Sequence, residues 1–240
     1  LFIGQEVAFG LQYAHEFKDI SWQKDLQIIH RDISPHNIMI GFDGQVKLID
    51  FGIAKTELQI EQTRNGAIKG KLGYMSPEQV LGEDLDFRTD LFSLGIILWE
   101  LITNKRLMNF GDDLSVQDFN KFTVPSFLSL GFTVPLEVES IVRTLLQKDR
   151  DHRYTSTTEV AKDLSSALHR LHSGFSSQDL GTFLQRVFAT EIKHQLKQWG
   201  NFLNKENENE VTKTALDPTS QSPVFRFKNQ FKILKNGQSA

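Results

Sequence analysis

The sequence predicts an α+β fold that is mainly α-helical and carries one small β-hairpin. Apolar residues recur at helical spacing over several segments. In the first of these segments, residues 2–16, they are Phe2, Ile3, Val7, Leu11 and Ala14. In contrast, two short β-prone runs, 38–40 and 46–49, flank the pair Asp43-Gly44. An Asp-Gly pair between such runs is typical of a tight hairpin.

The other helices are predicted from the same spacing and from capping residues. Segments with helical patterns are 89–102, 136–147, 157–172 and, as one or two helices, 177–203. Ser76 and Pro77 favour the start of a short helix, and either Thr155 or Ser156 is suited to cap the 157–172 helix. The segments between them are predicted as a polar loop at 18–25, a strand-like run at 26–29, a long surface loop at 53–75 and some helix near 115–121.

Composition narrows the possible classes of function. The 240 residues carry a net charge of −3, which gives no electrostatic case for binding nucleic acid. The chain has no cysteine, which excludes disulfides and thiol catalysis and suits a reducing, cytoplasmic location. No apolar run is long enough to span a bilayer, so we expect no membrane segment.

Three oxygen-bearing side chains stand at the two ends of the predicted hairpin. Asp32 and Asn37 lie in the loop that enters it, and Asp50 follows its second strand. Phosphoryl transfer requires a positioned hydroxyl, an acceptor for its proton and cations on the phosphates. Asp32 can accept the proton, while Asn37 and Asp50 offer the oxygen ligands that Mg²⁺ prefers. Alone, each would be an ordinary surface or capping residue, but together they predict a phosphoryl-transfer site.

These motifs, in this order, resemble those of protein kinases. The segment His30-Arg31-Asp32-Ile33-Ser34-Pro35-His36-Asn37 is similar to the family's catalytic loop. Asp50-Phe51-Gly52 is similar to its magnesium motif, and Ser76-Pro77-Glu78 to the end of its activation segment. Asp90-Leu91-Phe92-Ser93-Leu94-Gly95 resembles the start of its long central helix. The resemblance covers residues 1 to about 172. The residues around the motifs are most like those of bacterial serine/threonine kinases.

The resemblance implies a role for each matching residue. Asp32 would be the catalytic base, and Asn37 and Asp50 would bind Mg²⁺ and, through it, ATP. Arg31 would meet a phosphate on the activation loop, for which Thr56 and Thr63 are candidates, although ordinary loop threonines are an equal alternative. The structural roles would be stacking of His30 on Phe51, an ion pair between Glu78 and Arg153, and bracing of the catalytic loop by Asp90.

One departure from the family pattern concerns the cation beside the base. Serine/threonine kinases usually carry Lys two residues after the catalytic Asp and Thr before the substrate loop, whereas this chain has Ser34 and Lys71. We hypothesise that the ammonium group has changed sides and that Lys71 neutralises the transferring phosphoryl group. A solvated loop lysine is an equal alternative. The pattern of tyrosine kinases is present at neither position.

The resemblance implies a serine/threonine kinase that uses ATP and Mg²⁺ on a protein substrate. The domain expected at 1–172 is the kinase large lobe, followed by a helical extension at 173–203 and a disordered tail at 204–240. No Gly-rich phosphate loop or strand Lys occurs, so the small lobe is absent from this chain. The alternative is therefore a non-catalytic interaction module or a truncated kinase remnant. A small-molecule phosphotransferase is disfavoured because it would not be expected to carry Ser76-Pro77-Glu78 and Arg153.

Overall fold

The computed structural model describes residues 1–19, 24–25, 27–51, 72–108, 122–208 and 224–226. The described chain divides into two compact units. The larger unit comprises residues 1–39 and 46–174 together with Arg226, and the smaller one comprises residues 40–45 and 175–225 within the described ranges. The larger unit holds the residues that the sequence assigns to catalysis.

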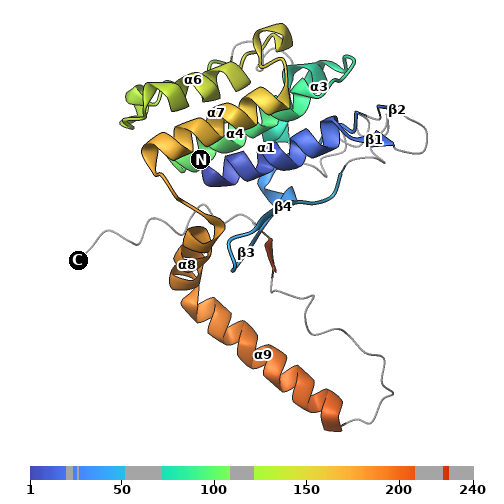
Figure 1. The fold of residues 1–240 in the computed structure, drawn as a ribbon, viewed down its shortest axis with the longest axis vertical. Helices are drawn as coiled ribbons and strands as arrows, with labels where there is room; N and C mark the ends of the chain where they lie inside the picture. Colours follow the sequence, from blue (N-terminus) through green and yellow to red (C-terminus); the bar gives the residue numbers. More distant parts are fainter. Residues whose placement is uncertain (20–23, 26, 52–71, 109–121, 209–223, 227–240) are drawn as a thin grey trace. The chain divides into compact units, whose positions relative to one another are not determined.

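Four helices form the body of the larger unit. They are α1 (Phe2–His15), α4 (Arg88–Thr103), α6 (Leu136–Leu145) and α7 (Thr157–Leu171). Helix α1 packs against α7 and α4, and α6 packs against α4 and α7 (Figure 1). Almost every side chain of α4 is buried, because this helix is apolar around most of its circumference. The predicted helices are confirmed, with α4 and α7 ending within one residue of the expected positions.

Two helix starts show why the capping residues matter. Short helix α3 (Pro77–Leu81) begins with a capping box, in which the Ser76 hydroxyl accepts from the Gln79 backbone N–H and the Gln79 side chain accepts from the Ser76 backbone N–H. At α7, the cap is Ser156, whose side chain accepts a hydrogen bond from the backbone N–H of Glu159. Of the two cap candidates, the structure therefore selects Ser156.

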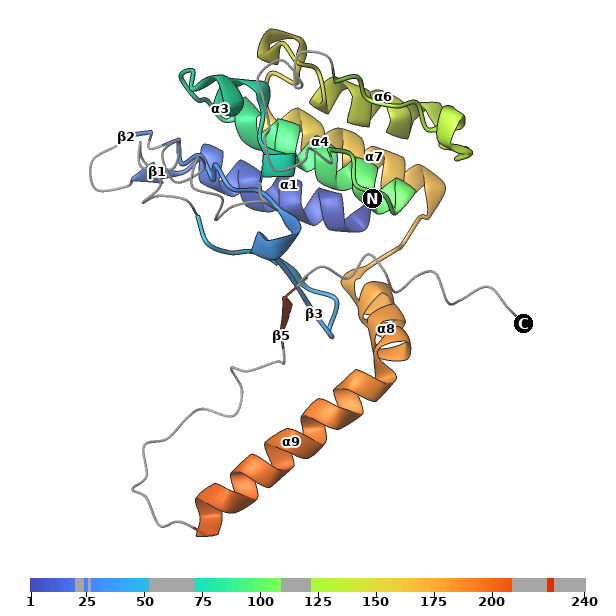
Figure 2. The same cartoon turned by 180° about the vertical axis from the view of Figure 1, so that it is seen from behind.

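The predicted hairpin is confirmed as β3 (Ile38–Gly41) and β4 (Val46–Leu48). A third strand, β5 (Val224–Arg226), makes the strand order β4-β3-β5 (Figure 2). Strand β4 also packs against α1, and a Cβ on Gly10 would lie only 3.2 Å from the Leu48 side chain. The hairpin is thus joined to the helical body through its second strand.

Two short segments differ from the sequence-based expectation. The predicted loop at 18–25 contains two two-residue strands, β1 (Lys18–Asp19) and β2 (Lys24–Asp25), paired antiparallel with Lys18 opposite Asp25 and Asp19 opposite Lys24. Opposite charges in facing positions favour such pairing. Residues 27–29, predicted as strand-like, form no strand. The helix predicted near 115–121 lies outside the described residues.

The smaller unit contains two helices, α8 (Ser177–Val187) and α9 (Ala189–Glu208). The sequence left one or two helices open, and the break falls at Phe188. Helix α9 runs past residue 204, where a disordered tail was predicted to begin, and Val224–Arg226 is a strand. The helix continues because Lys205 and Glu206 are good helix formers and neither Gly nor Pro occurs between 201 and 208. Among the described residues, no helix is long and apolar enough to cross a bilayer.

Candidate active site

The catalytic loop brings Asp32 and Asn37 into direct contact. The amide nitrogen of Asn37 donates to the carboxylate of Asp32 at 2.9 Å and to its backbone carbonyl at 2.7 Å. A single 3-10 turn at Pro35–Asn37 makes this possible, because its first hydrogen bond joins the Asn37 N–H to the Ser34 carbonyl. Asn37 is 3% exposed, so its amide is fixed in place while the Asp32 side chain keeps access to solvent.

The hairpin then returns the chain to Asn37 from the other side. The backbone N–H of Ile49 donates to the Asn37 carbonyl at 3.0 Å, which places the next residue, Asp50, beside the same loop. Asp50 is exposed and has a φ of 59°, a left-handed conformation that is uncommon for a residue other than glycine. Non-glycine residues held in this region concentrate at functional sites.

The donor atoms at this place fit a hard cation such as Mg²⁺. Asn37 uses its amide nitrogen on Asp32, so its amide oxygen is the atom that remains for a metal. Asp50 adds an exposed carboxylate, and Mg²⁺ usually takes only one or two protein oxygens beside water and phosphate. In the described parts of the chain, no group of three or more His, Cys, Asp or Glu side chains is arranged so that it could hold a metal ion.

Asp90, at the start of α4, holds the backbone of the catalytic loop. Its two carboxylate oxygens accept the backbone N–H groups of His30 and Arg31, both at 2.8 Å, and Asp90 is fully buried. Arg31 has a φ of 65°, and its carbonyl accepts from the side chain of Gln79 at 2.9 Å. The predicted bracing by Asp90 is confirmed, and it holds a left-handed residue next to Asp32.

His30 is a neutral packing residue of the loop. Burial lowers its pKa, and the positive contribution of nearby Asp90 does not offset that effect. The ring nitrogen Nε2 donates to the Ile49 carbonyl at 3.0 Å, while Nδ1 lies 3.4 Å from the backbone N–H of Asp32 and can accept from it. The ring centroids of His30 and Phe51 are 4.5 Å apart, which confirms the predicted stacking.

The predicted ion pair between Glu78 and Arg153 is confirmed as a buried bidentate pair. The two N···O distances are 2.7 and 2.8 Å, and both residues are at most 3% exposed. Burial by itself would raise the pKa of Glu78, but the hydrogen bonds and charge of Arg153 outweigh it and the net pKa is lowered. The pair fixes α3 against the turn that precedes α7.

A second buried glutamate was missed by the sequence-based reasoning. Glu100, within α4, accepts from the Tyr74 hydroxyl at 2.6 Å and from the Leu107 backbone N–H at 3.1 Å, and Arg106 contacts both Tyr74 and Glu100. Burial raises the pKa of Glu100 and also that of Tyr74. A charged residue inside an otherwise apolar helix was the available signal, because such a group needs buried partners.

The histidine at the end of α1 is another residue that the sequence did not single out. His15 Nε2 lies 2.9 Å from a carboxylate oxygen of Asp90, and its Nδ1 lies 2.7 Å from the Thr157 hydroxyl. The His15 side chain thus joins the residue that braces the catalytic loop to the start of α7. Nothing in the local sequence pattern marks this contact, because its three residues come from distant segments.

Of the two residues that depart from the family pattern, Ser34 and Lys71, the structure describes only Ser34. Ser34 is 1% exposed, and its hydroxyl has no hydrogen-bond partner among the residues that the structure describes. The predicted partner, Lys71, lies outside the described residues, as do the candidate phosphosites Thr56 and Thr63.

Comparison with known proteins agrees with this geometry. Residues 2–165 match the model of the family described as the protein kinase domain. The chain is 38% identical over 189 residues to tyrosine-protein kinase MasK of Myxococcus xanthus, covering 78% of this chain and 29% of that protein. It is 32% identical over 168 residues to serine/threonine-protein kinase PrkC of Bacillus subtilis, covering 69% of this chain and 24% of that protein.

A third relative is the probable serine/threonine-protein kinase PknB of Lactococcus lactis. It is 34% identical over 143 residues, covering 58% of this chain and 22% of that protein. The chain thus spans less than a third of the length of each of these three relatives. With a family match over more than half of its residues and the catalytic-loop geometry described above, this chain belongs to the protein kinase family.

Proposed function

We propose that the protein transfers the γ-phosphoryl group of ATP to a serine or threonine hydroxyl of a protein substrate. The observation that carries the proposal is the 2.9 Å hydrogen bond from Asn37 to the Asp32 carboxylate, next to the backbone bond that delivers Asp50. It supports a site in which a 3-10 turn brings Asn37 to Asp32 and the hairpin brings Asp50 to the same loop, so that a proton acceptor and two oxygen ligands lie close together.

The steps assigned to the chain's own residues are few. The Asp32 carboxylate orients the substrate hydroxyl and accepts its proton while the hydroxyl oxygen bonds to the γ-phosphorus and the bond to the ADP oxygen breaks. Asn37 holds Asp32 in that orientation. Asn37 and Asp50 would hold Mg²⁺, which when bound supplies positive charge beside the phosphates.

We assign the cation beside the transferring group to Lys71. The buried hydroxyl of Ser34 supports this assignment, because it has no hydrogen-bond partner among the described residues and stands at the place where the family pattern has an ammonium group. Because Lys71 lies in a loop that reaches the substrate in the family pattern, its charge can act on the phosphoryl group from the substrate side. We further propose that the reaction takes place in the cytoplasm.

The choice of serine and threonine over tyrosine rests on the family pattern. The relatives named above include two serine/threonine kinases and one tyrosine kinase. Ser34 and Lys71 match the pattern of neither class, so the choice of the first class rests on the residues around the motifs, which are most like those of bacterial serine/threonine kinases.

A transfer assay on the full-length protein tests the proposal. Purified protein is incubated with ATP labelled at the γ-phosphate, Mg²⁺ and a mixture of basic protein substrates, and the labelled residue is identified by phosphoamino-acid analysis. We expect phosphoserine and phosphothreonine, and no transfer by Asp32→Asn. Phosphotyrosine alone would contradict the specificity, and no transfer by the wild type would favour a non-catalytic interaction module.

A further inference from the structure

Helix α8 follows the part of the chain that matches the kinase family, yet it contacts the turn of the hairpin whose two ends adjoin Asn37 and Asp50. The Gln185 side-chain amide donates to the Phe42 backbone carbonyl at 2.9 Å, in the turn between β3 and β4. Leu180 and Leu184, one turn apart on the same helix, are each 7% exposed. The turn and α8 belong to the same compact unit.

Two glycines allow the backbones of helix and turn to touch. A Cβ on Gly181 would lie 2.8 to 3.0 Å from backbone atoms of Phe42 and Asp43, and a Cβ on Gly44 would lie only 1.8 Å from the Ser177 carbonyl. Gly44 also has a φ of 79°, which other residues rarely adopt. A glycine inside a helix costs stability relative to alanine, so its presence at 181 indicates a contact that needs the space.

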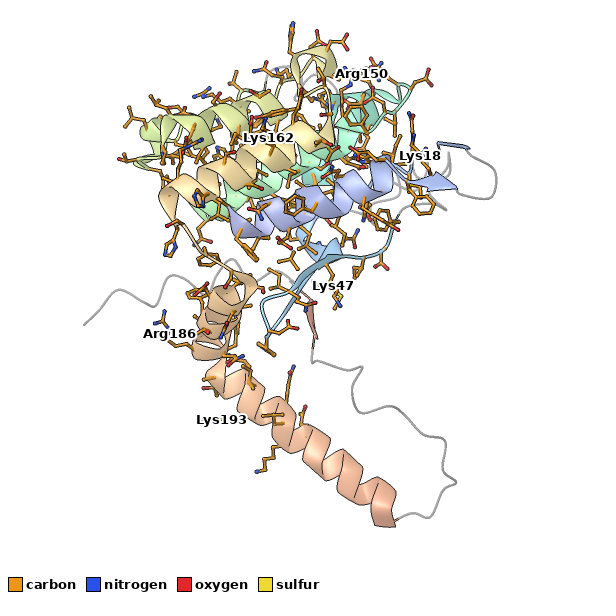
Figure 3. The ribbon with its side chains drawn as sticks, in the orientation of Figure 1. Lys18, Lys47, Arg150, Lys162, Arg186 and Lys193 are labelled. Atoms are coloured by element: carbon orange, nitrogen blue, oxygen red, sulfur yellow. The ribbon has the colours of Figure 1, made fainter. Side chains whose placement is uncertain are left out.

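Helix α8 is a defined element with its own start. The Asp179 carboxylate accepts from the backbone N–H of Ser176 at 2.8 Å and from its hydroxyl at 2.6 Å, which closes a capping box at the first turn. Arg186, the residue after Gln185, is exposed and is labelled in Figure 3. The helix is therefore fixed at its first turn by this cap and along its buried side by the hairpin turn.

The turn and the catalytic residues are the two ends of one ladder. At the turn, the Gly41 N–H donates to the Gln45 carbonyl at 2.9 Å, and at the other end the Ile49 N–H donates to the Asn37 carbonyl at 3.0 Å. Fraying of the hairpin at its turn therefore removes hydrogen bonds between the two strands that lead to Asn37 and Asp50. Small displacements of groups that position a reacting centre reduce turnover strongly.

The match to one kinase relative extends beyond the residues that match the family model. The match to tyrosine-protein kinase MasK covers 78% of the 240 residues, and a match of that extent takes in residue 185 wherever it begins. The family match itself ends at residue 165. The similarity therefore extends into α8.

We propose that α8 is a positioning element of the kinase, with Gly181 and Gln185 as positioning residues that hold the β3–β4 turn. The proposal rests on the phosphotransferase function proposed above. Among the described residues of the hairpin, Gly181 and Gln185 contact its turn, and they act on catalysis by keeping Asn37 and Asp50 in register.

Hydrogen exchange and kinetics on three variants test this role. Gly181→Ala improves the helix-forming tendency of α8 but adds a Cβ against the turn, whereas Gln185→Ala removes the side-chain bond to Phe42. Gln178→Ala is the matched control, because Gln178 is an exposed glutamine of the same helix whose side chain makes no hydrogen bond to the turn among the described residues. Exchange of amides 41–45 is measured by mass spectrometry in this chain, and Mg²⁺-dependent turnover is measured in the full-length protein.

We expect exchange at 41–45 to become about tenfold faster in Gly181→Ala and Gln185→Ala and to stay unchanged in Gln178→Ala. In the same two variants, the Mg²⁺ concentration for half-maximal turnover rises by about threefold or more, with the helical circular dichroism signal retained. Unchanged exchange, or faster exchange with unchanged Mg²⁺ dependence in an active enzyme, would overturn the positioning role. An inactive wild type would instead contradict the proposed function, and the exchange data would still report on the contact.

Discussion

The amide nitrogen of Asn37 donates two hydrogen bonds to Asp32, one to its carboxylate and one to its backbone carbonyl. The proposed proton acceptor and the proposed metal ligand are therefore held together by direct hydrogen bonds. A change at Asn37 alters the orientation of Asp32 even where no metal is bound, and the two roles can be separated by the choice of substitution.

Asn37→Asp keeps an oxygen ligand for Mg²⁺ but removes the N–H donor and places a second carboxylate against Asp32. We expect turnover in the full-length protein to fall by about a hundredfold or more, because general-base catalysis of this kind contributes about 10²–10⁴. The two carboxylates also raise the pKa of one of them, so the acidic limb of the pH–rate profile shifts to higher pH. An unshifted profile would show that Asn37 does not orient the base.

The pKa of buried Glu78 is lowered and that of buried Glu100 is raised. We therefore expect substitution by glutamine to destabilise the protein much more at position 78 than at position 100. Glu78→Gln leaves the Arg153 guanidinium buried without a counter-charge, which costs about 3–5 kcal/mol of the free energy of unfolding. Glu100→Gln removes a carboxylate whose ionised form is disfavoured by burial, and we expect a loss below about 1 kcal/mol. Urea unfolding measures both. Glu139→Gln, in the exposed pair with Arg143, is the control and should change the free energy by less than about 0.5 kcal/mol.

The same two residues predict a pH dependence. The folded-state pKa of Glu78 lies below its ordinary value of 4.5, so its stabilisation is present above pH 4.5 and is lost as the pH falls through the lowered folded pKa. The folded-state pKa of Glu100 lies above 4.5, so its contribution is greatest below pH 4.5 and declines as the pH rises through the raised folded pKa. Urea unfolding from pH 4 to 8 should therefore show Glu100→Gln gaining on the wild type with rising pH. A constant difference would mean that Glu100 is not perturbed by burial.

Asp90→Asn tests the bracing of the catalytic loop. An asparagine has one acceptor oxygen for the two backbone N–H groups of His30 and Arg31, so one buried donor loses its partner at a cost of about 1–3 kcal/mol. Turnover should fall more than stability alone explains, because Arg31 is held in its left-handed conformation beside Asp32. Retained turnover in a folded variant would show that the loop keeps its shape without this anchor.

The proposed change of sides of the ammonium group predicts a rescue. Lys71→Thr should lower turnover by about 10²–10³, the usual effect of removing one charge-stabilising donor, and adding Ser34→Lys should restore a substantial part. Loss without rescue would mean that the two positions do not face each other. Near-normal turnover of Lys71→Met in a folded protein would show that Lys71 is an ordinary loop lysine.

The helices and the hairpin were predictable because their signals are local. Spacing of apolar residues, the Ser76 cap and the Asp43-Gly44 turn each involve residues close together in the chain. The contacts of His15 with Asp90 and of Tyr74 with Glu100 join distant segments, and no periodicity records them. The pairing of Glu78 with Arg153 is equally distant, and only the family resemblance made it predictable. The contact of α8 with the β3–β4 turn has one signal in the sequence, which is Gly181 within a helical pattern.

Arg153 uses all five of its N–H groups: two on Glu78 and one each on the carbonyls of Arg88, Gln147 and Lys148. A lysine offers three donors and no planar fork, so it cannot replace this guanidinium. Because one side chain bonds to three segments at once, none of them can open without breaking hydrogen bonds to Arg153. The start of α3, the start of α4 and the connection from α6 to α7 should therefore unfold as a single cooperative block, with one common opening free energy for their slowly exchanging amides.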